Sequence, residues 1–128
     1  MRTLLATLLL LGAVGCTPKF NGSVQLDGRP LTITGCRSGQ VYKFVGVDLH
    51  AENGVILRLN YDLSGQARAY VFPSGEPSGV EVGLCGPMNI QQQTSRINHV
   101  YNQKGSAKLS CTGAGHSIVG DIQFENCH

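Results

Sequence analysis

Apolar and polar residues alternate along most of the chain from residue 20 onward, so that every second side chain is apolar. This alternation is typical of β-strands that bury one face, because successive side chains of a strand point to opposite sides of the sheet. The apolar segments are short, and turn residues such as Gly, Asp, Asn and Pro separate them. The expected strands cover residues 24–26, 31–33, 41–49, 55–61, 67–72, 80–84, 88–97, 107–111 and 118–124.

The turns between these segments indicate that neighbouring strands pair antiparallel. Asp27-Gly28 lies between two alternating segments, which is a strong signal for a tight hairpin. The chain contains no segment with a clear helical pattern. We therefore expect an all-β fold, an antiparallel β-sandwich of about eight or nine short strands, with a small barrel as the alternative. Within the expected strand at 41–49, one face should carry Val41, Val45, Val47 and Leu49, and the other Tyr42 and Phe44.

The first 16 residues have the pattern of an export signal. Arg2 gives a positive start, an apolar run of 11 residues extends from Leu4 to Val14, and small residues precede Cys16. The run is too short to span the hydrocarbon core of a bilayer, which needs about 20 residues. A buried core helix is the alternative, but Arg2 and the change to polar turn residues after Cys16 argue against it.

The residues Ala13-Val14-Gly15-Cys16 resemble the lipobox of bacterial lipoproteins, although that family most often has Leu where this chain has Ala13. The resemblance implies that Cys16 is linked to diacylglycerol, that the chain is cut before it, and that the new amino end is acylated, for example with palmitate. Because Thr17 and not Asp follows the Cys, the family's sorting rule implies the outer membrane, on its periplasmic or surface face. Ala13-x-Gly15 also fits the general signal peptidase, which would leave Cys16 as a free thiol.

These features divide the chain into a signal peptide at 1–15, a lipidated N-terminus with a short tether at 16–19, and a β-sandwich domain at 20–128. The last residues, 124–128 (Phe-Glu-Asn-Cys-His), resemble the ends of small predicted lipoproteins from Gram-negative bacteria. This second resemblance implies common descent with such lipoproteins, and it implies no activity.

The composition excludes several classes of protein. Charged residues make up 14% of the chain and hydrophobic residues 41%, which excludes a disordered chain and a long coiled coil. The formal net charge is +2, and without residues 1–15 it is close to neutral because only Arg2 is lost. Since no basic stripe is present, we do not expect nucleic acid as a partner.

The cysteines lie at positions 16, 36, 85, 111 and 127. If Cys16 carries the lipid, the remaining even set indicates two disulfides in an exported β domain, and no C-x-x-C pair supports zinc. If 107–111 and 117–124 form a hairpin, Cys127 lies roughly 30 Å from Cys111, far beyond the about 7 Å that a disulfide allows. We therefore favour Cys85–Cys111 with Cys36–Cys127, and the alternative is Cys36–Cys85 with Cys111–Cys127.

No constellation of residues indicates an enzyme, a cofactor or a metal site. The histidines at 50, 99, 116 and 128 match no metal-binding spacing, and no G-x-S-x-G sequence is present. Asp48 and His50 share a face of an expected strand and could form a dyad, although this spacing more often marks two residues on a solvated edge. We expect that the protein is not an enzyme.

One segment, 89–104, departs from the alternation because amide and hydroxyl side chains occupy both faces. Amides donate and accept hydrogen bonds, and an aromatic ring can stack on a ligand. We interpret the segment as a candidate recognition face for glycan or peptide; the alternative is a solvated strand whose polar residues prevent edge pairing. The candidate residues are Gln91, Gln93, Arg96, His99 and Tyr101.

Together these patterns predict a membrane-anchored bacterial lipoprotein that acts as a binding or structural module of the cell envelope, with an envelope glycan or protein as its partner. A carrier of a lipid or small hydrophobic ligand is one alternative and needs an internal cavity. A small envelope enzyme is the other alternative and needs a deep polar pocket around Asp48 and His50.

Overall fold

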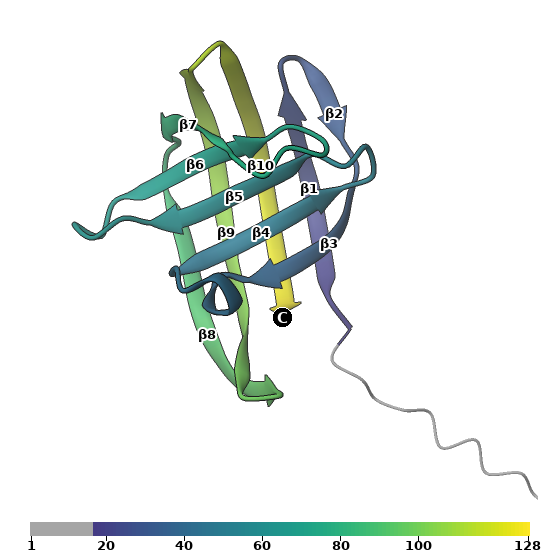
Figure 1. The fold of residues 1–128 in the computed structure, drawn as a ribbon, viewed down its shortest axis with the longest axis vertical. Coiled ribbons are helices and arrows are strands. Elements are labelled where there is room, and N and C mark those ends of the chain that lie inside the picture. The colour runs from purple at the N-terminus through teal and green to yellow at the C-terminus, as the bar shows by residue number, and fades with distance from the viewer. Residues whose placement is uncertain (1–16) are drawn as a thin grey trace, which may run out of the picture.

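The computed structural model describes residues 17–128, which fold into two antiparallel β-sheets of five strands each (Figure 1). The first sheet has the strand order β2-β1-β10-β9-β8, and the second has the order β3-β4-β5-β6-β7. In Figure 1 the strands of the second sheet cross those of the first at a steep angle. The all-β antiparallel sandwich predicted from the sequence is confirmed, and it has ten strands in place of eight or nine.

In the first sheet the two ends of the described chain pair with each other. Lys19 lies opposite Glu125, and Leu26 lies opposite Ile118. β8 forms one edge of the sheet, which is the position that the alternative interpretation of segment 89–104 assumed. The strands of this sheet are β1 (Lys19–Leu26), β2 (Arg29–Leu31), β8 (Met88–Ile97), β9 (Val100–Gly113) and β10 (His116–Cys127).

The second sheet is a meander whose strands follow one another in chain order. Each neighbouring pair is antiparallel, as the short turns of the sequence predicted. Its strands are β3 (Ile33–Ser38), β4 (Gly46–Ala51), β5 (Ile56–Tyr61), β6 (Ala67–Phe72) and β7 (Val80–Leu84).

The core lies between the two sheets and consists of the apolar residues that alternate along the strands. Their removal from water is the main term that stabilises the fold, about 25 cal/mol per Å² of apolar surface. Tyr61 of β5 also joins the sheets, because its hydroxyl donates to the Met88 carbonyl at 2.9 Å and accepts from the Ile90 amide at 3.1 Å. The largest fully buried apolar side chains are Leu49, Leu57, Leu59, Ile118, Ile122, Val24, Val47 and Val71.

The strand predicted at 41–49 is wrong in its first half. Residues Gly39–Tyr42 form a short 3-10 helix, η1, which Ser38 caps by accepting a hydrogen bond from the Gln40 amide at 3.2 Å. Lys43 adopts a left-handed conformation that ends the helix, and β4 begins only at Gly46. Val41 and Val45 are therefore 50% and 65% exposed instead of lying in the core.

The structure has the disulfides Cys36–Cys127 and Cys85–Cys111, the favoured pairing. The Cα atoms are 4.8 Å and 4.6 Å apart, respectively, within the range that a disulfide needs. The predicted β9–β10 hairpin also separates Cys111 from Cys127, because Cys111 lies opposite Ile118 on β10 and Cys127 lies opposite Gln103 on β9. The pairing of Cys111 with Cys127 is thereby excluded.

The predicted signal peptide (1–15) and Cys16 lie outside the described residues. Since β1 begins at Lys19, the part of the predicted tether that the structure describes before this strand is Thr17 and Pro18. Within residues 17–128, none of the helical segments has the length and apolar character needed to cross a bilayer.

Candidate functional site

An open polar groove crosses the outer face of the first sheet, with a volume of about 400 Å³. Four strands, β1, β10, β9 and β8, contribute exposed side chains to it. These are the polar positions of the alternation, and their strand neighbours point into the core. The groove therefore follows from the alternation of polar and apolar side chains, because pairing of the four strands brings their polar side chains onto one face of the sheet.

The strand register places one row of uncharged side chains across the groove. The row runs from Asn21 on β1 to Gln123 on β10, then to Ser106 on β9 and Asn89 on β8. Each of these groups can donate and accept hydrogen bonds, as a ligand rich in hydroxyl groups requires.

A second row carries the charges of the groove. Lys19 lies opposite Glu125, and Lys104 lies opposite Gln91. The Gln91 amide donates to the Asn89 side-chain carbonyl at 3.2 Å, which links the two rows. Two lysines against one glutamate leave the groove with one excess positive charge, a balance that suits a neutral or weakly acidic ligand.

The five residues predicted as a recognition face do not lie together. Gln91 lines the groove, Gln93 turns toward β10, and Arg96, His99 and Tyr101 lie at or beside the tip of the β8–β9 hairpin. The pairing of β8 with β9 shifts register between Gln92 and Arg96, which interrupts the regular alternation after Gln91. His99 and Tyr101 lie farther along, in the turn and in β9. Only Gln91 of these residues belongs to the groove.

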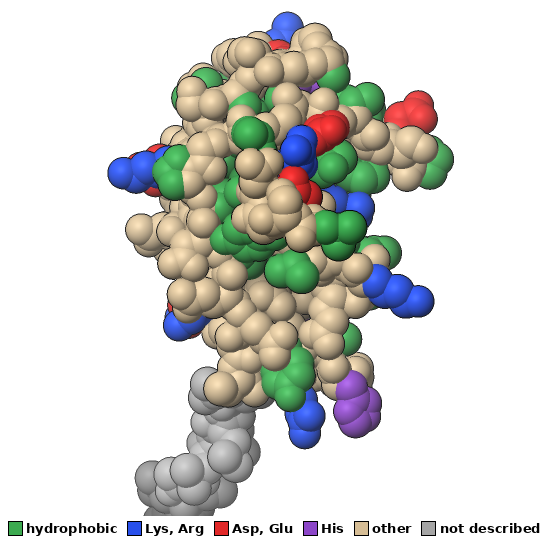
Figure 2. Space-filling model, turned by 90° about the vertical axis from the view of Figure 1, so that its left-hand side faces the viewer, with side chains coloured by type: hydrophobic (Ala, Val, Ile, Leu, Met, Phe, Trp, Pro, Cys, Tyr) green, Lys and Arg blue, Asp and Glu red, His purple; other side chains and the backbone are tan. Residues whose placement is uncertain are grey.

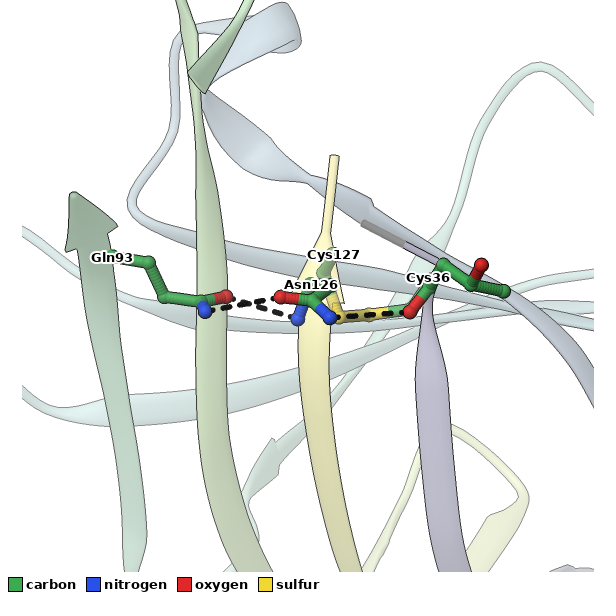
Figure 3. Close-up of a disulfide and its surroundings, with 5 residues drawn as sticks. Cys36, Gln93, Asn126 and Cys127 are labelled. Atoms are coloured by element: carbon green, nitrogen blue, oxygen red, sulfur yellow. Dashed lines mark hydrogen bonds between the residues drawn. A yellow bond between two sulfur atoms is a disulfide. The ribbon is translucent and has the colours of Figure 1, made fainter. Parts of the chain in front are cut away.

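Gln93 and Asn126 form a structural contact across the sheet. Figure 3 shows Gln93 on β8 reaching past β9 to Asn126 on β10, beside the Cys36–Cys127 disulfide. The Gln93 amide donates to Asn126 Oδ1 at 3.1 Å, and the Asn126 backbone amide donates to Gln93 Oε1 at 2.9 Å. Asn126 Nδ2 in turn donates to the Thr17 carbonyl at 3.2 Å. This network therefore holds the start of the described chain against the end of β10.

The tip of the β8–β9 hairpin is a tight turn. Asn98 and His99 both have positive φ angles, as the commonest two-residue hairpin turn requires. The Arg96 guanidinium lies 5.7 Å from the centre of the Tyr101 ring. The Tyr101 backbone amide donates to Gln40 Oε1 at 3.0 Å, which joins the hairpin to η1.

Asp48 does not form a dyad with His50, and it does not lie on a solvated edge. It is buried on β4, which lies between β3 and β5. Both carboxylate oxygens accept hydrogen bonds from Arg58, at 2.8 Å and 3.0 Å. The Arg58 guanidinium lies 4.2 Å from the centre of the Phe44 ring and 4.6 Å from that of Phe72. Asp48 is thus committed to an ion pair that aromatic rings enclose.

His50 lines a different cavity, of about 550 Å³, together with Pro18, Arg37, Ile97 and His128. His50 Nε2 is buried without a hydrogen-bond partner, and His128 Nε2 lies 2.8 Å from the Ile97 carbonyl. In the part of the chain from 17 to 128, no three His, Cys, Asp or Glu side chains are grouped so that they could hold a metal ion.

The environment of His50 predicts a pH effect on stability. Burial lowers the pKa of His50 below 6.5, the charge of Arg37 lowers it further, and Asp48 opposes this shift. The unfolded chain therefore binds the proton first as the pH falls, so the free energy of unfolding decreases from about pH 6.5 downward. Chemical denaturation between about pH 7 and pH 5 should show a shallower decrease for His50→Gln than for the wild type. An equal change in the slope for His99→Gln, in the exposed turn, would contradict this assignment.

Comparison with protein-family models, with curated proteins and with solved structures gives no match to this chain. The chemistry of the lining residues is therefore what indicates the ligand of the groove. Sequence reasoning missed Lys19, Asn21, Gln123 and Glu125, because they lie at opposite ends of the domain in sequence and meet only through the pairing of β1 with β10. The signal that could have found them is the polar half of the alternation in these two strands.

Proposed function

We propose that this chain is a membrane-anchored lipoprotein of the bacterial cell envelope and that its groove binds a polar envelope glycan. The lipobox-like residues before Cys16 support the anchor. The two disulfides support an oxidising compartment outside the cytoplasm. The outer membrane remains the location that Thr17 favours by the family's sorting rule.

The observation that carries the binding function is the groove across β1, β10, β9 and β8. Its uncharged row offers donors and acceptors at the spacing of neighbouring strands, about 5 Å, which is similar to the length of one sugar ring. Lys19 and Lys104 add positive charge that would attract carboxylate or phosphate substituents of a glycan.

The alternatives have less support. In residues 17–128 packed apolar side chains fill the space between the sheets, so nothing favours a carrier of a hydrophobic ligand. An enzyme would need a polar reactive cluster, and the carboxylate of Asp48 is already bound by Arg58. A binding module requires neither feature.

Binding to the groove can be tested with the mature lipoprotein in detergent micelles, titrated calorimetrically with soluble oligosaccharides from peptidoglycan and lipopolysaccharide core. Lys104→Ala and Gln123→Ala should each weaken binding about tenfold, because each removes hydrogen bonds to the ligand. The matched controls are Lys108→Ala on β9 and Gln25→Ala on β1, both exposed and outside the groove. Equal losses in the controls, or no binding by the wild type, would refute the glycan site.

The anchor is tested separately, by palmitate labelling of bacterial cells that produce the full chain. The wild type should be labelled and the Cys16→Ser variant should not, because that cysteine is the proposed acyl acceptor. Equal labelling of the two chains would exclude Cys16 as the site of lipidation while leaving the groove to be judged by its own titration.

A further inference from the structure

The point at which the described chain begins is held firmly against the domain. The Thr17 carbonyl accepts a hydrogen bond from Asn126, which is bonded twice to Gln93 and lies next to the Cys36–Cys127 disulfide. In the sequence Cys16 directly precedes Thr17. A lipid on Cys16 would therefore bring this end of the sandwich directly to the bilayer surface.

The β8–β9 hairpin, the C-terminus and η1 all lie at this same end. Figure 1 shows the hairpin and the C-terminus at the lower end of the molecule, where the described chain also begins. His128 contacts the Ile97 carbonyl, and both residues line one cavity with Pro18. Gln40 of η1 accepts a hydrogen bond from the Tyr101 amide at 3.0 Å. We name the exposed residues of η1, the loop after it and the hairpin the anchor-end surface; the Tyr42 ring in it also lies 5.9 Å from Arg58, at the edge of the outer face of the second sheet. The surface consists of Val41, Tyr42, Lys43, Val45, Arg96 and Ile97.

The anchor-end surface combines exposed apolar groups with basic groups. Tyr42 is 55% exposed and Ile97 is 43% exposed, so both side chains are accessible to a partner. Figure 2 shows green, blue and purple side chains together at the lower end of the molecule. Apolar and aromatic side chains flanked by positive charge are typical of protein surfaces that enter a lipid headgroup layer.

The distribution of charge supports a negatively charged partner. Neither 33–47 nor 88–104, the two segments that contain this surface, includes an acidic residue. The basic residues at or near this end are Lys19, Arg37, Lys43, Arg96 and Lys104, and they outnumber its acidic groups, Glu125 opposite Lys19 and the terminal carboxylate of His128 beside Ile97. Each Lys or Arg near an anionic membrane surface contributes about 1 kcal/mol of binding free energy.

We propose that the anchor-end surface is a second, non-covalent membrane contact, which binds the headgroup layer of an anionic phospholipid bilayer beside the lipid on Cys16. The proposal rests on the proposed anchor, because the anchor is what places this end at the bilayer. The contact fixes the orientation of the domain: the hairpin tip enters the headgroups, and the groove faces sideways just above the membrane. A glycan in the groove would then be bound close to the membrane surface.

The contact is tested with the mature chain carrying Cys16→Ser, which has no acyl chains, by co-sedimentation with vesicles. The chain should bind vesicles of phosphatidylcholine with phosphatidylglycerol, and binding should weaken with added salt and be absent with phosphatidylcholine alone. The variant Lys43→Glu/Arg96→Glu should bind about 30-fold or more weakly, given about 1 kcal/mol per lost charge. The control Arg29→Glu/Lys108→Glu changes the net charge equally but lies outside the surface, so it should bind far more tightly than the first variant.

A spectroscopic measurement separates insertion of the surface from general electrostatic attraction. The chain contains no Trp, so a single introduced Trp is a clean reporter. Tyr42→Trp fluorescence should shift to the blue with the anionic vesicles, because the indole leaves water. Leu63→Trp, in the fully exposed turn between β5 and β6, should not shift.

Equal vesicle binding by the two charge-reversal variants, or an equal fluorescence shift at positions 42 and 63, would overturn the proposal. If Cys16 is not lipidated, the result is different: palmitate does not label Cys16, but vesicle binding still depends on Lys43 and Arg96. In that case the contact stands without the covalent lipid. Loss of glycan binding in Lys104→Ala or Gln123→Ala concerns the groove alone.

Discussion

Replacing Cys36 and Cys127 with Ala should lower the free energy of unfolding by about 4–5 kcal/mol. This disulfide closes a loop of 91 residues, and the loss of chain entropy in the unfolded state grows with loop length. Both cysteines are buried, so Ala preserves the apolar character of the site. The melting temperature should fall by roughly 15–20 °C for a domain of this size.

The second disulfide provides the matched control for this prediction. Cys85–Cys111 closes a loop of 26 residues, so its replacement by Ala should cost about 3.5 kcal/mol, less than the first pair. Urea denaturation of the two double variants, under the same conditions, gives both values. If the shorter loop proved the more costly to open, loop entropy would not be the main effect of these bonds.

Loss of Cys36–Cys127 has a local consequence as well. Cys127 follows Asn126, whose side chain holds Gln93 and the Thr17 carbonyl. Opening the disulfide should therefore loosen the start of the described chain before the rest of the sheet. Hydrogen exchange should rise first at the Asn126 amide, which donates to Gln93.

Arg58→Met should destabilise the fold by about 3 kcal/mol, because it leaves the carboxylate of Asp48 buried without its partner. The Asp48 side chain is only 4% exposed, whereas that of Arg58 is 24% exposed, so the effect should fall at the lower end of the range for buried pairs. Met keeps an unbranched apolar stem between the rings of Phe44 and Phe72.

A double-mutant cycle distinguishes the lost ion pair from lost packing. Asp48→Asn/Arg58→Met removes the negative charge together with its partner, and it should be more stable than Arg58→Met alone by about 1 kcal/mol or more. Thermal and urea unfolding of the four chains measure this difference. If the double variant were no more stable than the single one, the contribution of Arg58 would come from its contacts with the rings.

Most strands and turns were predictable because their signals act over a few neighbouring residues. The strand expected at 31–33 is wrong, because β2 ends at Leu31 and β3 runs from Ile33 to Ser38. The alternation in 67–72 and 80–84 gave both strands with their observed bounds, and Asp27-Gly28 forms the expected hairpin turn. The segment 41–45 was not predictable in this way. Its apolar spacing imitates a strand, whereas the Ser38 cap and the left-handed Lys43 turn the backbone into η1 and the loop that follows it.

The disulfide pairing was predictable because strand geometry limits the distance between two cysteines. The groove was predictable only in part, because the segment 89–104 contains Asn89, Gln91 and Lys104, whereas the lining residues of β1 and β10 were not singled out in the sequence. Gln93 lies where the register of β8 shifts, and its side chain bonds to Asn126 instead of lining the groove.

The sequence by itself determined the period of the strands, the positions of most turns and which cysteines could meet, since each of these depends on backbone geometry and side-chain alternation within short segments. Only the tertiary structure decided that β1 pairs with β10, which assembles the groove and places η1, the hairpin tip and Thr17 at one end. The physical reason is that pairing between strands about 100 residues apart depends on burying the whole core at once, and no local pattern encodes that choice.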